Sequence, residues 1–292
     1  MIWLIGSKGM LGKELSLLLE RERLNFIGTD KEIDITNKNV LSKFAQEQTN
    51  IKWIINCAAY TAVDKAEDDI ELCRLLNEEG AANIALISRE INAVMIHIST
   101  DYVFNGKGNS PYTEEKETDP IGVYGLTKRD GELKVLKENT QSYIIRTAWL
   151  YGEYGNNFVH TMLRLFKEKE TISVVNDQKG SPTWAYDLAR VVIEFIKQSN
   201  GGKKIPFGIY HYTNEGAITW YDFAKEIYKQ AKETGLVTKN CEIKPCTSAE
   251  FQAKVTRPAY SVLDKKKIMG ILGIYIPLWN DSLRNVIRKL AE

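Results

Sequence analysis

The chain has 292 residues, of which 43% are hydrophobic and 26% charged, as is ordinary for a globular protein. Its 39 basic and 38 acidic residues give a net charge of +1, which gives no reason to expect nucleic acid or an anionic membrane as a partner. No apolar run approaches the roughly 20 residues of a membrane span, and no signal peptide is apparent, so we expect a cytoplasmic protein.

The first half of the chain alternates short apolar runs with amphipathic stretches. The apolar runs predict buried strands at residues 2–5, 24–28, 52–56, 94–99 and 142–147. The stretches between them predict helices at residues 10–20, 39–48, 69–90 and 124–138. Strands that are continuously hydrophobic have both faces covered. The alternation therefore predicts an α/β fold, a doubly wound parallel sheet of the Rossmann type with right-handed crossovers.

After Leu150 the pattern becomes mixed. Helices are predicted at residues 156–167, 184–198, 219–232 and 278–291, and strands at 171–175 and 209–212. We expect the sheet unit to comprise residues 1–151, joined by 184–200. Most of residues 152–292 would then form a smaller mixed α+β lobe over the carboxyl edge of the sheet.

A glycine-rich turn, Gly6-Ser7-Lys8-Gly9-Met10-Leu11-Gly12, follows the first predicted strand and opens the first helix. Glycine is needed where the turn is tight, where the backbone approaches a pyrophosphate and where the helix packs close to the strand. The helix N-terminus offers free N–H groups to phosphates. The turn therefore predicts that residues 1–151 bind a dinucleotide, NAD or NADP.

The choice between the two cofactors stays open. Asp30 ends the second predicted strand, and an acid about 20 residues past the glycines favours NADH by binding the adenosine ribose. Lys8 and Lys31 lie nearby and could bind the 2′-phosphate of NADPH instead.

Two groups of residues predict proton transfer. Tyr124 and Lys128 are four residues apart on a predicted helix and therefore share one face. A nearby ammonium lowers the pKa of a phenol, which is near 10 when unperturbed, and makes proton transfer easier. Thr100, Asp101 and Tyr102 directly follow the fourth predicted strand, at the sheet edge where open α/β sheets bind ligands.

With these motifs the chain resembles the extended short-chain dehydrogenase/reductase superfamily and, within it, the dTDP-4-dehydrorhamnose reductases. The matching stretches are residues 56–67, 99–104, 124–128, 146–152, 155–158, 176–183 and 257–261. The last of these lie in the second lobe and separate this family from relatives that share only the cofactor domain.

The resemblance implies reduction of the C4 ketone of dTDP-4-dehydro-L-rhamnose by NADPH or NADH. Tyr124 would donate the proton, Lys128 would support it and bind the ribose, and Thr100 would be the third catalytic group. Implied substrate contacts are Thr100, Asp101, Tyr102 and Trp149. Implied cofactor contacts, besides Tyr124 and Lys128, are Gly6, Gly9, Met10, Leu11, Gly12, Asp30, Asp34, Ile35, Ala59, Tyr60 and Thr61.

The sequence departs from the family pattern in places. Tyr60 stands where histidine is usual, Asn105 replaces an aspartate and Gly122 replaces an asparagine. No cysteine or histidine has zinc-ligand spacing, so no catalytic metal is predicted, and His97 is expected to be a buried core residue. The family also implies a homodimer, and a Mg²⁺ ion that we cannot locate from the sequence.

Two alternatives remain. A sugar-nucleotide epimerase or dehydratase shares the Tyr/Lys pair, although a dehydratase usually has glutamate where Tyr102 follows Asp101. A non-catalytic, NADP-binding regulatory subunit of methionine adenosyltransferase has a similar fold. The intact Thr100, Tyr124 and Lys128 favour catalysis.

Overall fold

A six-stranded parallel sheet forms the centre of the computed structural model, which describes residues 1–251 and 253–292. The strand order is β10-β5-β4-β3-β1-β2, and every neighbouring pair is parallel. The strands are β1 (Ile2–Ile5), β2 (Phe26–Thr29), β3 (Trp53–Asn56), β4 (Val94–Thr100), β5 (Ser142–Thr147) and β10 (Gly208–His211). The predicted doubly wound sheet is confirmed.

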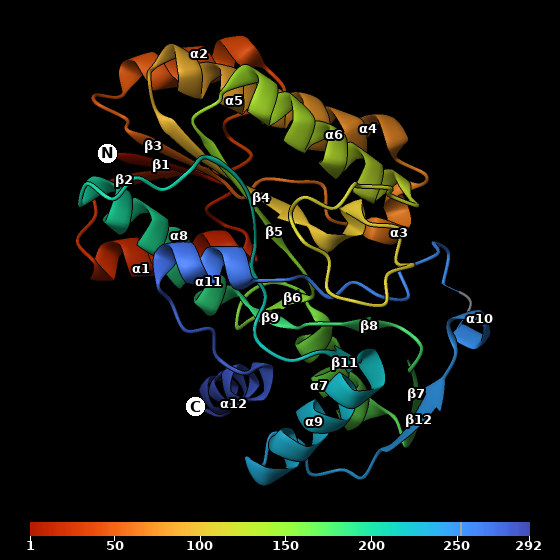
Figure 1. The fold of residues 1–292 in the computed structure, drawn as a ribbon. Coiled ribbons are helices and arrows are strands. Elements are labelled where there is room, and N and C mark those ends of the chain that lie inside the picture. Colours follow the sequence, from red (N-terminus) through yellow and green to blue (C-terminus); the bar gives the residue numbers. More distant parts are fainter. Residues whose placement is uncertain (252) are drawn as a thin grey trace.

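Helices cover both faces of this sheet (Figure 1). One face carries α1 (Met10–Arg21), α8 (Ala185–Asn200) and α11 (Lys266–Leu272), and the other carries α2 (Lys38–Glu47), α5 (Ala81–Glu90) and α6 (Val123–Glu138). In β1, Ile2 and Leu4 belong to the first core while Trp3 and Ile5 belong to the second. Successive side chains of a strand point to opposite faces, so a continuous apolar run is what a sheet covered on both sides requires.

The predicted helix at residues 69–90 is not regular. It divides into α4 (Ile70–Arg74), a π-helical turn η1 (Leu75–Gly80) and α5, and is preceded by the short α3 (Val63–Ala66). Helix α6 passes very close to the π-turn, because a Cβ on Gly131 would lie 2.1 Å from the carbonyl oxygen of Asn77. Sequence periodicity alone did not reveal this bulge.

In its described residues, the second lobe has its own apolar core and three two-stranded sheets. Its elements are β6 (Leu150–Tyr151), α7 (Phe158–Glu168), β7 (Thr171–Val175), β8 (Lys179–Gly180), β9 (Thr183–Trp184), β11 (Ile218–Thr219), α9 (Trp220–Glu233), β12 (Glu242–Cys246), α10 (Ser248–Phe251) and α12 (Trp279–Ala291). The sequence did not predict β12 or α11.

The chain returns twice to the large sheet after residue 200. Strand β10 pairs with β5, and α11 packs against the core beneath α1 and α8. Both segments lie within residues that we assigned mostly to the second lobe. Because of these two returns, the two units are interwoven along the chain. The carboxyl edge of the sheet faces the second lobe (Figure 1).

None of the described helices is long and apolar enough to cross a bilayer.

Candidate active site

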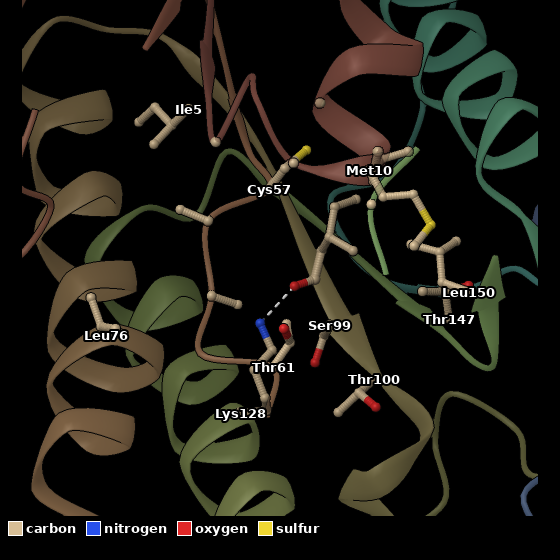
Figure 2. Close-up of a pocket in the computed structure, with 18 of the residues that line it drawn as sticks. Ile5, Met10, Cys57, Thr61, Leu76, Ser99, Thr100, Lys128, Thr147 and Leu150 are labelled. Atoms are coloured by element: carbon tan, nitrogen blue, oxygen red, sulfur yellow. Dashed lines mark hydrogen bonds between the residues drawn. The ribbon is translucent and has the colours of Figure 1, made fainter. Parts of the chain in front are cut away.

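A cavity of about 790 Å³ opens at the carboxyl ends of β1, β3, β4 and β5. The chain leaves β1 toward β2 on one side and returns to β3 on the other, so the cavity lies at the topological switch point where such sheets bind ligands. Every residue predicted for the site lines this cavity except Tyr60. In Figure 2, Met10 reaches the cavity from one side, and Ser99, Thr100 and Lys128 reach it from another.

The glycines of the turn are required by the backbone geometry. Gly6 has φ +80°, in the left-handed region, and its Cβ would lie 2.8 Å from the Ala58 nitrogen. A Cβ on Gly12 would lie 2.1 Å from the Gly6 carbonyl oxygen. No side chain fits at either position without moving the backbone, so the turn holds α1 directly against the end of β1.

The N-terminus of α1 has free hydrogen-bond donors at the cavity wall. Its N-cap is Gly9, and no side chain caps it. The N–H groups of Met10, Leu11 and Gly12 belong to the first helical turn, which has no intrahelical acceptors. All three residues line the cavity. Free N–H groups at the positive end of a helix dipole suit the pyrophosphate of a dinucleotide.

The acidic residue after β2 is already bonded to the turn. The two carboxylate oxygens of Asp30 accept hydrogen bonds from the backbone nitrogens of Lys8 and Lys31, each at 3.0 Å. The Lys8 amine pairs with Glu32 at 3.1 Å, while Lys31 lines the cavity. Asp30 therefore fixes the glycine turn, and Lys31 is the cation placed to meet a phosphate at this end.

Lys128 is buried, with 2% of its surface exposed. Its Nζ donates a hydrogen bond of 2.7 Å to the carbonyl oxygen of Ile98, drawn as the dashed line in Figure 2. Burial lowers the pKa of Lys128 to about 8, against the opposing effect of Glu132. Glu132 is itself held by Arg146 through bonds of 2.9 and 2.6 Å. The lysine therefore holds its proton less tightly than an exposed lysine does.

The phenol of Tyr124 differs from our expectation. We expected Lys128 to lower its pKa, but burial raises that pKa above its usual value, with Asp101 adding to the rise. A hydrogen bond with Thr100 opposes the rise only in part. The Lys128 amine points toward the Ile98 carbonyl oxygen, and it does not determine the pKa of the Tyr124 phenol. A phenol with a raised pKa is protonated at neutral pH, which is the state that a proton donor needs.

Two residues that line the cavity near Tyr124 carry buried polar atoms without partners. The Thr100 hydroxyl donates to Asp101 Oδ1 at 3.1 Å and accepts from the Tyr102 nitrogen at 3.2 Å. Asp101 Oδ2 and Ser99 Oγ are buried and have no hydrogen-bond partner within the described part of the chain. Burial raises the pKa of Asp101 to about 6, although the nearby Ser261 and Thr100 hydroxyls oppose the rise. Because buried polar atoms are costly unless bonded, the two unpartnered atoms fit a ligand with hydroxyl or amide groups.

The second lobe contributes an aromatic wall. Trp149 lines the cavity, has φ +49° and stacks on Trp220 with ring centroids 3.5 Å apart. A Cβ on Gly180 would lie 2.5 Å from the Trp149 ring, so the ring is closely packed on that side as well. A flat, fixed aromatic surface here suits a planar or apolar part of a ligand.

Tyr60 lies outside the cavity lining. Its hydroxyl donates to Asp69 at 2.7 Å, and this bond raises the pKa of Tyr60 to about 12. Its backbone nitrogen and oxygen both bond the Asn77 side chain, at 2.8 and 3.1 Å. The neighbours Ala59 and Thr61 do line the cavity. The segment is therefore fixed by Asn77, with the Tyr60 side chain bonded elsewhere.

Some cavity residues were not predicted as site residues. Most of them lie at or directly after the carboxyl end of a strand, and this position is the signal that would have found them. They include Cys57, Ala58, Val63, Ile98, Ser99, Thr147, Ala148 and Leu150. In the described part of the chain, no three His, Cys, Asp or Glu side chains cluster as metal ligands would.

Comparisons with known proteins agree with this geometry. A family model described as the RmlD substrate binding domain matches residues 1–292. A dTDP-4-dehydrorhamnose reductase of Aggregatibacter actinomycetemcomitans is 39% identical over 290 residues, which cover 98% of each chain.

Two solved structures are similar over nearly their whole length. A dTDP-4-dehydrorhamnose reductase ortholog from Clostridium acetobutylicum has a TM-score of 0.92 and 40% identity, covering 100% of this chain and 99% of that one. The enzyme of Bacillus anthracis in complex with NADP has a TM-score of 0.91 and 38% identity, covering 99% and 98%. Since family model, sequence and structure agree along the whole chain, this protein belongs to the dTDP-4-dehydrorhamnose reductase family of the extended short-chain dehydrogenase/reductase superfamily.

Proposed function

We propose that this protein reduces the C4 ketone of dTDP-4-dehydro-L-rhamnose to dTDP-L-rhamnose with NADPH or NADH. The observation that supports this most is that a dinucleotide-binding turn and a set of proton-transfer residues line the same cavity. The glycine turn and the uncapped start of α1 line the same space as Thr100, Tyr124 and Lys128. In this proposal, residues 1–151 with 184–200 bind the cofactor and most of 152–292 binds the sugar nucleotide.

The cofactor fits what the residues offer. The N–H groups of Met10, Leu11 and Gly12 would hold the pyrophosphate, and Lys128 would bond the ribose. Lys31 would neutralise a 2′-phosphate, which favours NADPH. The Bacillus anthracis relative is a complex with NADP. When bound, the reduced nicotinamide supplies the hydride for the carbonyl carbon.

The protein's own part is to orient the ketone and supply a proton. The Thr100 hydroxyl lies beside the phenol and would orient the carbonyl oxygen. Tyr124, protonated at neutral pH, would donate its proton to that oxygen as negative charge develops. Lys128 would then return a proton to the phenolate. Asp101 Oδ2 and the Trp149 ring would hold the sugar nucleotide.

The test is consumption of reduced nicotinamide when purified protein receives dTDP-4-dehydrorhamnose made in place by upstream enzymes. We expect one NADPH consumed per dTDP-rhamnose formed. An epimerase or dehydratase would turn over the sugar with no net consumption, and a regulatory subunit would bind NADP and oxidise nothing. Either result would overturn the proposal.

Tyr124→Phe separates catalysis from binding. Removal of the proton donor should lower kcat by about 10²–10⁴-fold, while the Kd for NADPH stays within about twofold because the phenol is not its main ligand. Tyr228→Phe, which removes a hydroxyl that bonds the Cys241 nitrogen in the second lobe, is the matched control. Unchanged turnover in Tyr124→Phe would remove this residue from the mechanism.

Two broader features also belong to the proposal. We expect the enzyme to work in the cytoplasm, where nucleotide sugars and NADPH are available. We also expect a homodimer, since large apolar side chains of α4, the π-turn and α6 are exposed, among them Leu72, Leu75 and Leu133. Light scattering of the wild type and of Leu133→Lys tests this, because a dimer through that face should dissociate.

A further inference from the structure

A row of buried polar side chains leads away from the cavity beneath Lys128. Asn56 ends β3 and His97 lies beside it in β4, at the paired position of the sheet. The exposed fraction is 1% for Asn56, 1% for His97 and 2% for Lys128. The proposed mechanism uses Lys128 but neither of the other two.

The hydrogen bonds around His97 fix the position of its ring proton. The Ala58 nitrogen donates to Asn56 Oδ1 at 3.0 Å, so the Asn56 amide must turn its Nδ2 toward His97 Nδ1, also at 3.0 Å. Nδ2 can only donate, and Nδ1 must therefore accept. Burial holds the pKa of His97 well below its usual value, so the ring is neutral and carries one proton. That proton is on Nε2.

The ring proton then faces the lysine. His97 Nε2 lies 3.3 Å from Lys128 Nζ. An ammonium has three donors and no acceptor, whereas a neutral amine has a lone pair that can accept. The Ile98 carbonyl oxygen accepts from Lys128 in either state. With its proton on Nε2, His97 therefore donates a hydrogen bond to the neutral amine of Lys128 and destabilises the ammonium form. The ring proton can move to Nδ1 only if His97 loses the hydrogen bond from Asn56.

We propose that His97 is a positioning residue for Lys128: held by Asn56, it points its Nε2–H at the lysine and makes the ammonium release its proton more readily. The consequence for turnover rests on the proposed function, in which Lys128 returns a proton to the Tyr124 phenolate. A donor whose pKa lies near the operating pH does this best, and the pKa of Lys128 is about 8.

The other titratable groups around the lysine do not supply this effect. Glu132 on α6 favours the ammonium, but Arg146 from β5 binds that carboxylate at 2.6 Å. The thiols of Cys57 and Cys73 stay neutral, because burial raises the pKa of both. The Tyr124 phenol is neutral as well. Among the described residues, the histidine is the one group bonded to the amine whose hydrogen bond distinguishes the ammonium from the neutral amine.

The first experiment needs no substrate and no variant in the measured sample. Long-range ¹H–¹⁵N NMR of histidine rings distinguishes a protonated Nε2 from a protonated Nδ1, and the chain has 3 histidines to assign. We expect His97 to be the Nε2–H tautomer, neutral from about pH 6 to pH 9. A proton on Nδ1 would overturn the proposal, whether or not the protein reduces a keto-sugar.

The second experiment follows the Lys128 titration by ¹³C-lysine NMR. His97→Gln keeps a polar side chain at the site but lets an amide oxygen face the amine. The titration midpoint of Lys128 should therefore rise by one pH unit or more, about tenfold in proton affinity. Asn56→Asp should move the His97 proton to Nδ1 and also raise the midpoint. His160→Gln, a change on α7 outside the cavity lining, should leave it unchanged.

The two NMR experiments test the role of His97 without requiring turnover, so they can fail independently of the proposed function. A midpoint that rises in Asn56→Asp alone would reflect the added carboxylate charge, and the proposal for His97 would fail. If the protein shows the proposed reductase activity, the basic limb of its kcat–pH profile should shift to higher pH in His97→Gln. KM for NADPH should change less than about twofold. A lower kcat with an unmoved profile would mean a purely structural role.

Discussion

The two sides of the cavity offer a ligand different kinds of group. On the α1 side these are backbone groups: Gly6 and Gly12 allow a close turn, and the first N–H groups of the helix are left free. On the β4 and α6 side, buried side chains such as Lys128 and His97 act through their protonation states. A backbone site tolerates no added atom, whereas a side-chain site can be altered one hydrogen bond at a time.

The backbone side should give the largest effect. Gly12→Ala would place a Cβ 2.1 Å from the Gly6 carbonyl oxygen. Since only backbone could move, we expect a loss of more than about 4 kcal/mol of stability, or a folded protein whose α1 has shifted and no longer binds NADPH. Thermal unfolding and NADPH titration measure both.

The matched control for that change lies in α11. A Cβ on Gly270 would meet no atom within 4 Å, so Gly270→Ala should stabilise the helix by about 0.5–1 kcal/mol. Wild-type NADPH affinity in Gly12→Ala would show that the turn is not closely packed and would break the contrast between the two sides.

The side-chain side should respond to pH. The pKa of Lys128 falls from 10.5 to about 8 on burial. Below pH 8 the folded and unfolded states both hold the proton, so the full cost of burying the charge is present. Between pH 8 and 10.5 the folded state loses its proton first, and wild-type stability rises with pH.

Lys128→Met removes the buried amine. The stability that this variant gains over the wild type should therefore be largest below pH 8. Because one pKa unit corresponds to about 1.4 kcal/mol, the relative advantage should shrink by on the order of 3 kcal/mol as pH rises to about 10.5. Denaturant unfolding of both proteins at several pH values measures it. A difference that is flat with pH would show that the buried amine is not perturbed.

The backbone side was also the easier one to predict. Continuous apolar runs give the strands of the first half, and glycine spacing after β1 gives the turn, because both depend on local sequence. The side-chain side depends on pairing between distant strands. His97 faces Asn56 only because β3 and β4 pair in that register, and so it was predicted to be an ordinary core residue.

The misses in the second lobe have the same cause. Strand β12 pairs with β7 although Glu242 and Thr171 are 71 residues apart at that contact, and it contains Pro245. No local pattern predicts such a strand. In the sheet unit, Tyr60 is included among cofactor contacts through the family resemblance. Its side chain and backbone are held by Asp69, the N-cap residue of α4, and by Asn77 in the π-turn.

The smallest expected effect lies where the two sides of the comparison meet. Asp30 is a side chain, but its carboxylate bonds the backbone of Lys8 and Lys31. If it acts through the turn, Asp30→Ala should weaken NADH and NADPH alike, each by about fivefold for about 1 kcal/mol, and Asp30→Asn, which keeps an acceptor oxygen, should weaken them less. If Asp30 binds the ribose directly, Asp30→Ala should lower the affinity for NADH. The affinity for NADPH should then rise relative to it, because a charge that repels the 2′-phosphate is gone. Kd values for both cofactors decide between these, and the geometry of the two backbone bonds leads us to expect the equal loss.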